Sequence, residues 1–226
     1  SLDGRTVLFA REGEAGRTGV TVTTQLLQTT RAAGALALNR ASHRVVFALL
    51  ADPELAGSPV RVLAAAAKAS VGTVHNTLAQ LTDAGHLLDG RLHHTGRLLD
   101  AWAEAYRRLI VRPLTPRALY ASDGHWPDNL RLEPNGVLLG GFAAAAVLDN
   151  QLRATDGIVY APTLGNAVTL LRLTSTPTPF RVEVRERFWG DDLPSPRPGL
   201  VPSVLIYGDL LRDGDARSLD IATNLR

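Results

Sequence analysis

The sequence contains no cysteine, and this absence sets the first limits on the protein. Disulfides, cysteine-ligated zinc sites and cysteine nucleophiles are excluded, and the composition is typical of a reducing cytosol. Long hydrophobic runs are also missing, since the run from Val60 to Ala67 is too short to span a bilayer. The first residues do not resemble a signal peptide. We therefore expect a cytoplasmic protein without membrane contact.

Methionine and lysine are the next scarce residues. Methionine is absent even at position 1, so we expect that the chain starts inside a longer protein and that residues 1–38 are an incomplete element. Lys68 is the only lysine, and nearly all positive charge is therefore arginine. This explains how a pI of 9.4 coexists with a net charge of only +2, because arginine keeps its proton far above neutral pH.

The positive charge is not evenly distributed. Residues 40–112 hold nine Arg or Lys against six Asp or Glu, together with five of the six histidines. Residues 113–226 hold eleven against thirteen. A basic middle segment is compatible with contact to phosphate, although the excess is small.

The pattern of residues predicts an α+β protein in three parts. Residues 1–38 are predicted to form a β-hairpin, with strands at 6–10 and 19–27. Residues 39–112 are mainly helical, and residues 113–226 form a mixed α/β domain. With 226 residues and 45% hydrophobic composition, the chain is long enough for these packed parts.

Residues 39–112 alternate short helical runs with turns. Ser42 and Ser70 are the expected N-caps of the first and third helices, and Gly85 is the expected C-cap of the third. Asp89-Gly90 between two short apolar runs predicts a hairpin. The expected helices span residues 42–51, 60–68, 71–84 and 97–110.

The third of these helices has an apolar and a polar face. Its predicted buried stripe, at spacings of three and four, consists of Val71, Val74, Leu78 and Leu81. The residues left outside are Gly72, Thr73, His75, Asn76, Thr77 and Gln80.

This order of helices and hairpin is that of a winged helix-turn-helix, in which the last helix enters the major groove of DNA. Asn and Gln can form bidentate hydrogen bonds to adenine, and Ser, Thr and Arg can bind phosphate or base edges. The expected base readers are Thr73, His75, Asn76 and Gln80. The expected phosphate contacts and further donors are Arg61, Lys68, Ser70, Arg91, His93 and Arg97.

Two other interpretations apply to the same residues. Small domains of three helices and a hairpin also serve as protein-binding modules, because any exposed helix has a polar face. His93-His94 could suggest a metal site, but adjacent residues on a strand point to opposite faces and no third ligand is evident. We expect no metal and no cofactor.

Residues 113–226 predict a mixed set of helices and strands. The expected strands span 158–161, 167–173 and 180–188, and the expected helices span 142–152, 203–212 and 216–224, with a proline-rich loop over 193–202.

Gly140-Gly141 before a helix and strand has two interpretations: a tight turn before a packed helix, which we favour, or the arrangement of nucleotidyltransferases, whose next strand carries two carboxylates one residue apart that hold metal ions. Here Asp156 has Ile158 at that spacing, and Glu183 alone could not hold the ions. Ser70 and Ser203 are better explained as helix caps than as nucleophiles. We therefore expect no enzymatic activity, and at most a nucleotidyltransferase-like fold without catalytic residues.

Residues 40–226 resemble a known family, the AbiEi-type antitoxins of type IV toxin–antitoxin (abortive infection) systems. The similarity lies in the run NRASHRVVFALLADPELAGSPVRVLAAAAKASVGTVHNTLAQLTDAGHLLDGRL and in the later blocks LLDAWAEAYRRLIVRPL, GGFAAAAVLDN, RERFWG, GLVPSVLIYGDLL and GDARSLDIA. Helix-turn-helix motifs are common, so the order of the later blocks is the more specific signal.

The resemblance implies a transcriptional regulator that binds inverted repeats ahead of its operon, represses it and counters a nucleotidyltransferase toxin without a lasting protein complex. Winged-helix regulators often bind two half-sites, so we expect a homodimer or paired binding. The alternatives are a winged-helix protein of plasmid replication or partition, and a protein-interaction module with a degenerate nucleotidyltransferase-like domain.

Overall fold

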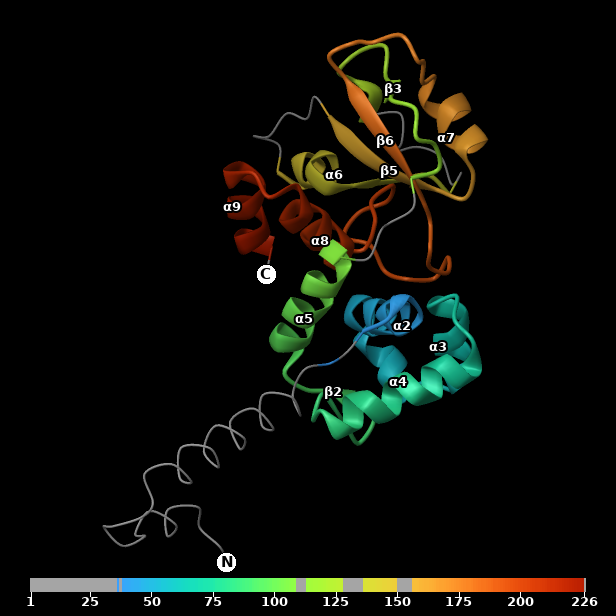
Figure 1. Ribbon diagram of the computed structural model, residues 1–226, viewed down its shortest axis with the longest axis vertical. Helices are drawn as coiled ribbons and strands as arrows, with labels where there is room; N and C mark the ends of the chain where they lie inside the picture. Colours follow the sequence, from blue (N-terminus) through green and yellow to red (C-terminus); the bar gives the residue numbers. More distant parts are fainter. Residues whose placement is uncertain (1–35, 37, 109–112, 128–135, 150–155, 226) are drawn as a thin grey trace, which may run out of the picture. The chain divides into compact units, whose positions relative to one another are not determined.

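The computed structural model describes residues 36, 38–108, 113–127, 136–149 and 156–225 (Figure 1). The described residues from Leu38 onward belong to one compact unit. The hairpin predicted at 6–27 lies outside the described residues, as does nearly all of the predicted segment 1–38. The fold is mixed α and β, with helices first and a small sheet with flanking helices after them.

Helices α2 (Arg40–Ala51), α3 (Val60–Ala66) and α4 (Val71–Asp83) come first, with the 3₁₀ helix η2 (Pro53–Gly57) after α2. An antiparallel hairpin of β1 (Leu87–Leu88) and β2 (Arg91–Leu92) follows, and α5 (Thr95–Arg108) completes this part. The predicted order of helices and hairpin is confirmed, although α5 begins two residues earlier than expected.

The first helix also begins earlier than predicted, because Asn39 and not Ser42 is its N-cap. The Asn39 side chain accepts hydrogen bonds from the backbone N–H groups of Ala41 and Ser42, both at 2.9 Å. The Ser42 hydroxyl accepts the Asn39 N–H at 2.9 Å and completes a reciprocal capping box. The prediction failed because the apolar periodicity starts a turn after the helix does.

In the described part of the chain, four strands form the larger sheet, in the order β3-β6-β5-β4. They are β3 (Leu119–Tyr120), β4 (Leu138–Gly140), β5 (Gly157–Ala161) and β6 (Arg181–Glu186). Strands β5 and β6 are parallel, with Val159 opposite Val184, and the two outer strands run antiparallel to their neighbours.

Among the described residues, four helices follow β3 in the chain, and they pack around the sheet or close the chain. They are α6 (Gly141–Leu148), α7 (Leu164–Leu171), α8 (Ser203–Asp213) and α9 (Ala216–Leu225). Figure 1 shows α6 and α7 on opposite sides of β5. The strand is therefore covered on both faces, which explains why Ile158, Val159, Tyr160 and Ala161 are all buried in succession.

The prediction of a strand over residues 167–173 is wrong, because most of this segment belongs to α7. The Thr163 hydroxyl accepts the Asn166 N–H at 3.3 Å and caps the helix. Its buried residues, Ala167 and Leu171, are four apart, as on one face of a helix. Parallel strands such as β5 and β6 can be joined only by a crossover connection, which is usually a helix. This tertiary requirement overrides the strand propensity of the segment.

The other predicted elements are present with shifted ends. Helix α6 ends at Leu148 instead of Leu152, which lies outside the described residues. Ser203 does not cap α8: Pro202 occupies the N-cap position, and no side chain forms a cap hydrogen bond there. Within the described ranges, no helix has the length and hydrophobicity needed to cross a membrane.

A buried polar cluster joins α5, the sheet and α8. The Arg185 guanidinium lies 2.6 Å from the Asp209 carboxylate, and these residues are 1% and 0% exposed. The hydroxyls of Tyr106 and Tyr160 donate to Asp209 at 2.6 and 3.0 Å. Burial raises the pKa of both tyrosines, so both keep the protons that they donate. Arg185 also binds Glu183 at 2.7 Å, and this set of partners makes the burial of a charge pair tolerable.

Candidate nucleic-acid interface

Helix α4 carries its own start and stop signals. The Ser70 hydroxyl accepts the Thr73 N–H at 3.1 Å, so the predicted N-cap is confirmed. Gly85, the residue after the C-cap, has a left-handed φ of 73°. The His86 N–H then donates to the Leu81 carbonyl at 2.8 Å and closes the turn.

The buried face of α4 is rotated from the predicted one. It consists of Val74, Thr77 and Leu81. Thr77 was expected outside, but its hydroxyl donates to the Thr73 carbonyl at 2.7 Å, so the side chain is buried without an unsatisfied donor. Val71 was expected inside and is instead 42% exposed.

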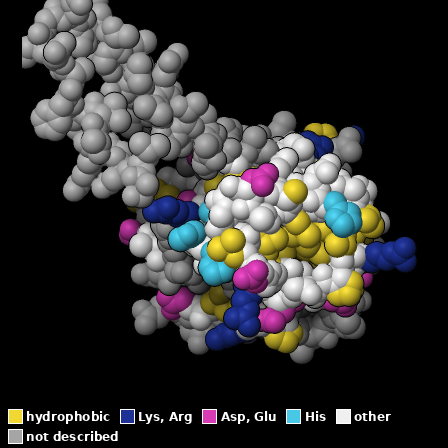
Figure 2. Space-filling view, turned by 90° about the horizontal axis from the view of Figure 1, so that it is seen from below, with side chains coloured by type: hydrophobic (Ala, Val, Ile, Leu, Met, Phe, Trp, Pro, Cys, Tyr) yellow, Lys and Arg dark blue, Asp and Glu magenta, His cyan; other side chains and the backbone are white. Residues whose placement is uncertain are grey.

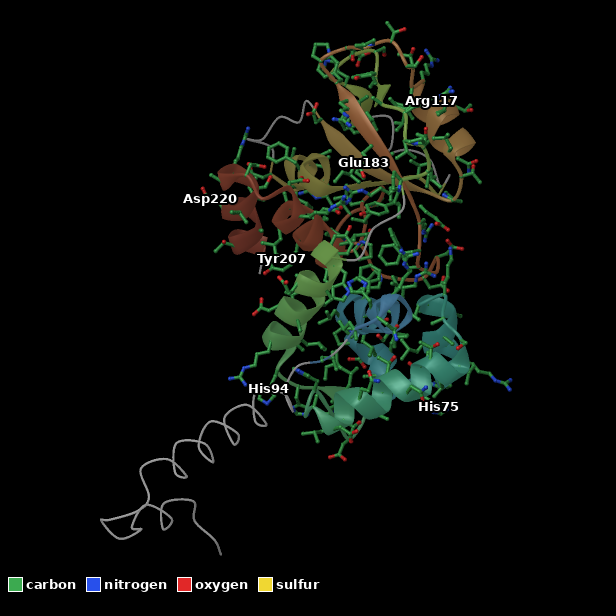
Figure 3. The ribbon with its side chains drawn as sticks, viewed as in Figure 1. His75, His94, Arg117, Glu183, Tyr207 and Asp220 are labelled. Carbon is green, nitrogen blue, oxygen red and sulfur yellow. The ribbon has the colours of Figure 1, made fainter. Side chains whose placement is uncertain are left out.

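The structure leaves nine of the ten predicted DNA-contact residues exposed. They lie on α3, on the turn after it, on α4, on the hairpin and its exit, and on α5: Arg61, Lys68, Ser70, His75, Asn76, Gln80, Arg91, His93 and Arg97. Thr73 is half-buried, and its hydroxyl lies 2.9 Å from that of Ser70, so it braces the helix cap. Figure 3 shows His75 projecting from α4 away from the rest of the unit, and His94 near the start of α5.

The outward face of α4 has two properties that suit a nucleic acid. A Cβ added at Gly72 would meet nothing within 4 Å, so the backbone there is open to a close approach. No carboxylate occurs from Ser70 to Thr82, and the first one is Asp83 at the far end of the helix. The N-terminal half therefore combines free polar side chains with the positive end of the helix dipole.

The hairpin beside α4 is short and rigid. Asp89 and Gly90 have positive φ values of 48° and 70°, as a two-residue turn of type I′ requires. A Cβ added at Gly90 would lie 3.5 Å from the Gly57 Cα, so the turn rests on η2. This support holds the exposed Arg91 at a defined place beside α4.

The surface around α4 is mixed in character. Figure 2 shows hydrophobic side chains gathered in the middle of the face seen from below, with charged and histidine side chains around them. Of the four large exposed hydrophobic side chains among the described residues, three belong to α3, α4 and β1: Val62, Val71 and Leu88. The face is therefore not uniformly basic.

The paired histidines His93 and His94 both lie next to His86. His93 donates its backbone N–H to the His86 carbonyl at 2.9 Å, and the rings of His86 and His94 lie 6.5 Å apart. The described residues contain no group of three His, Cys, Asp or Glu side chains placed to hold a metal ion.

A cavity of about 480 Å³ lies where the starts of β5 and β6 meet α6 and α9. Both carboxylates considered for catalysis, Asp156 and Glu183, are in its wall. Asp156 accepts the Arg181 backbone N–H at 3.3 Å. Burial alone would raise the pKa of Glu183, but its hydrogen bonds to Arg185 lower that pKa. The two acids thus already serve structural partners.

The buried ion pair of Arg185 and Asp209 was not predicted from the sequence. A partial signal exists, because Glu183 and Arg185 are two apart in a strand and so share a face. Nothing local indicates the partner Asp209, which comes from a helix 24 residues later.

Comparison with known proteins identifies the family. The model described as "Transcriptional regulator, AbiEi antitoxin, Type IV TA system" matches residues 91–226, from β2 to the end of the chain. This is more than half of the chain, although it does not include α2 to α4. No curated protein and no solved structure matches the chain. The chain therefore belongs to the AbiEi antitoxin family of transcriptional regulators of type IV toxin–antitoxin systems.

Proposed function

We propose that α2 to α5 with the β1–β2 hairpin form a winged helix-turn-helix that binds operator DNA, and that the protein represses its own operon. One observation carries the proposal: the Ser70-capped helix α4 exposes a polar face without a carboxylate before Asp83, directly after a short helix and turn and directly before a hairpin. The regulator family of the matched region supports the same conclusion.

In this proposal α4 enters the major groove with its N-terminal half foremost. Asn76 binds an adenine through two hydrogen bonds, and His75 and Gln80 contact neighbouring base edges. The cap at Ser70 and the adjacent Lys68 bind phosphate at the positive end of the helix. Asp83 lies on the same face as Asn76, seven residues further along, but at the C-terminal end of α4, where its repulsion by the phosphates is weakest if the N-terminal half enters the groove.

The flanking donors hold the protein on the DNA backbone. Arg91 on the hairpin and Arg97 on α5 contact phosphates on one side of α4, and Arg61 on α3 does so on the other. Such contacts fix the position of α4 without reading sequence.

The wider role follows from the family. We propose that the protein acts in the cytoplasm on an inverted repeat, as a dimer or as paired monomers, and that it counters a toxin encoded beside it. We also propose that it acts without catalysis, since Asp156 and Glu183 lie in hydrogen bonds to Arg181 and Arg185.

A protein-interaction role for the same face is the second candidate, because Val62, Val71 and Leu88 are exposed there. A winged helix serving plasmid replication or partition would bind DNA in the same way. A neighbouring nucleotidyltransferase gene would favour the antitoxin role over this one.

The test is a titration of the chain against its own upstream DNA and a scrambled duplex over a range of salt concentrations. A specific repressor binds the upstream DNA at least about 1000-fold more tightly, with an affinity that falls steeply as salt rises. Equal weak binding to both duplexes would rule out base reading by α4 and favour the protein-interaction role.

A further inference from the structure

The loop Arg187–Gly190, which follows β6, reaches the end of α3. The Gly190 N–H donates to the Ala66 carbonyl at 2.8 Å. Ala66 is the last residue of α3, and the turn into α4 begins directly after it. A segment from the sheet domain is therefore hydrogen-bonded to the helix that precedes α4.

The approach is between two backbones. A Cβ added at Gly190 would lie 2.8 Å from the Ala65 carbonyl oxygen and 3.1 Å from the Ala66 Cα. No flexible side chain separates the two segments, so any residue larger than glycine must displace either the loop or the end of α3.

Aromatic contacts fix the loop to the helical part as well. The Phe47 ring of α2 lies 5.2 Å from that of Phe188 and 5.6 Å from that of Trp189. The Arg187 guanidinium lies 5.5 Å from the Trp189 ring and donates to the Gly190 carbonyl at 3.0 Å. The loop thus has a defined shape and cannot swing freely away from α3.

The loop also touches the buried polar cluster. The Trp189 ring lies 5.3 Å from that of Tyr160, whose hydroxyl binds Asp209 and Arg185. The cluster, the loop and the end of α3 therefore form a continuous series of contacts from the sheet to the turn before α4.

Helix α3 needs such support. It has only seven residues, and no side chain caps its start. Helices this short are marginal on their own, and their position depends on packing. The turn after it includes Lys68 at a positive φ of 45°, a conformation that only its surroundings can hold.

We infer that the Arg187–Gly190 loop is a positioning element for α4, through which the C-terminal half sets the affinity of the protein for specific DNA. This inference rests on the proposed function.

The test compares the full-length Gly190→Ala variant with Gly165→Ala as a matched control. An added Cβ at Gly165 meets only the Thr163 hydroxyl, at 4.0 Å, so this variant should behave as the wild type. For each protein we would measure urea unfolding, amide hydrogen exchange over residues 64–72, and affinity for upstream and scrambled DNA.

We expect Gly190→Ala to speed exchange over residues 64–72 and to weaken binding to upstream DNA by about tenfold, the effect of one lost base contact. Binding to scrambled DNA should change by less than about twofold, since phosphate contacts tolerate small displacements. A loss of stability alone would weaken binding to both duplexes by the same factor, and this result would overturn the inference. Normal hydrogen exchange together with normal affinity in a folded variant would overturn it as well.

Arg187→Gln provides a milder change if Gly190→Ala does not fold. It removes the hydrogen bond to the Gly190 carbonyl, so it should speed exchange over residues 64–72 and weaken binding to upstream DNA, both to a smaller extent. If neither change occurs, the inference is overturned. If the wild type shows no preference for upstream DNA, the proposed function fails. Hydrogen exchange then still decides whether the loop positions the turn.

Discussion

His43 should make the stability of the protein depend on pH. The side chain is 4% exposed between α2 and α5, its ring stacks on Trp102 at 4.8 Å, and its Nε2 lies 3.3 Å from the Trp102 carbonyl. Burial lowers the pKa of His43 from 6.5 to about 4; the Trp102 carbonyl opposes this and the Arg44 charge adds to it. The folded protein therefore holds a neutral imidazole at every pH above about 4.

The direction and size of the effect follow from this pKa. Below pH 6.5 the unfolded chain binds a proton that the folded chain does not, so the free energy of unfolding falls as the pH is lowered. Each pKa unit corresponds to about 1.4 kcal/mol, and the shift from 6.5 to about 4 therefore amounts to about 3 kcal/mol. Above pH 6.5 His43 should contribute no slope.

The assay is urea unfolding of the wild type and of His43→Phe at intervals between pH 7 and pH 4.5. The variant keeps an aromatic ring against Trp102 but loses a hydrogen bond, so it should be about 1 kcal/mol less stable at pH 7. The wild type then loses stability on acidification while the variant lacks this contribution, and the order of stability should reverse between about pH 5 and 6. Parallel curves across the whole range would refute the reasoning.

Four further predictions concern the buried cluster, the cavity and the DNA face. Arg185→Met should destabilise the protein by about 3–5 kcal/mol in urea unfolding at pH 7, since Asp209 stays buried without a counter-charge; a loss below about 1 kcal/mol would contradict this. Asp213 is also in the wall of the cavity beside Glu183; burial raises its pKa to about 6, so its ionisation opposes folding as the pH rises from about 4 to 6. Asp213→Asn should therefore flatten the dependence of the free energy of unfolding on pH between about 4 and 6. The effect should stay below about 1 kcal/mol because the side chain is solvent-accessible, and an unaltered slope would exclude a contribution of Asp213. Asn76→Ala should lose about 1–3 kcal/mol of binding at one base pair, whereas an equal loss on scrambled DNA would end its role as a base reader. Arg97→Gln should weaken binding to all sequences and reduce the salt slope by about 1; an unchanged slope would remove it from the phosphate contacts.

Much of the proposed DNA-binding part could be predicted from the sequence because its signals are local. Ser70 and Gly85 mark the ends of α4 through contacts within a few residues of themselves. Asp89-Gly90 sets a two-residue turn by backbone conformation alone. The exposure of Asn76 and Gln80 follows from helical periodicity once those ends are known.

Two of the errors arose where distant parts of the chain compete with a local preference. The face of α4 depends on what packs against it, so Thr77 is buried and Val71 exposed, against the simple apolar pattern. The segment Ala167–Leu171 is compatible with a strand by composition, but it forms a helix because it connects two parallel strands.

The sequence by itself therefore determined the order of helices, turns and hairpin, the caps that delimit α4, and the polar residues on its outward face, because each depends on neighbours within about one or two turns of chain. Only the tertiary structure decided the pairing of Arg185 with Asp209 and the contact of Gly190 with the end of α3. These contacts join residues far apart in the chain, and they form only when burial of the surrounding apolar surface brings the sheet and the helices together.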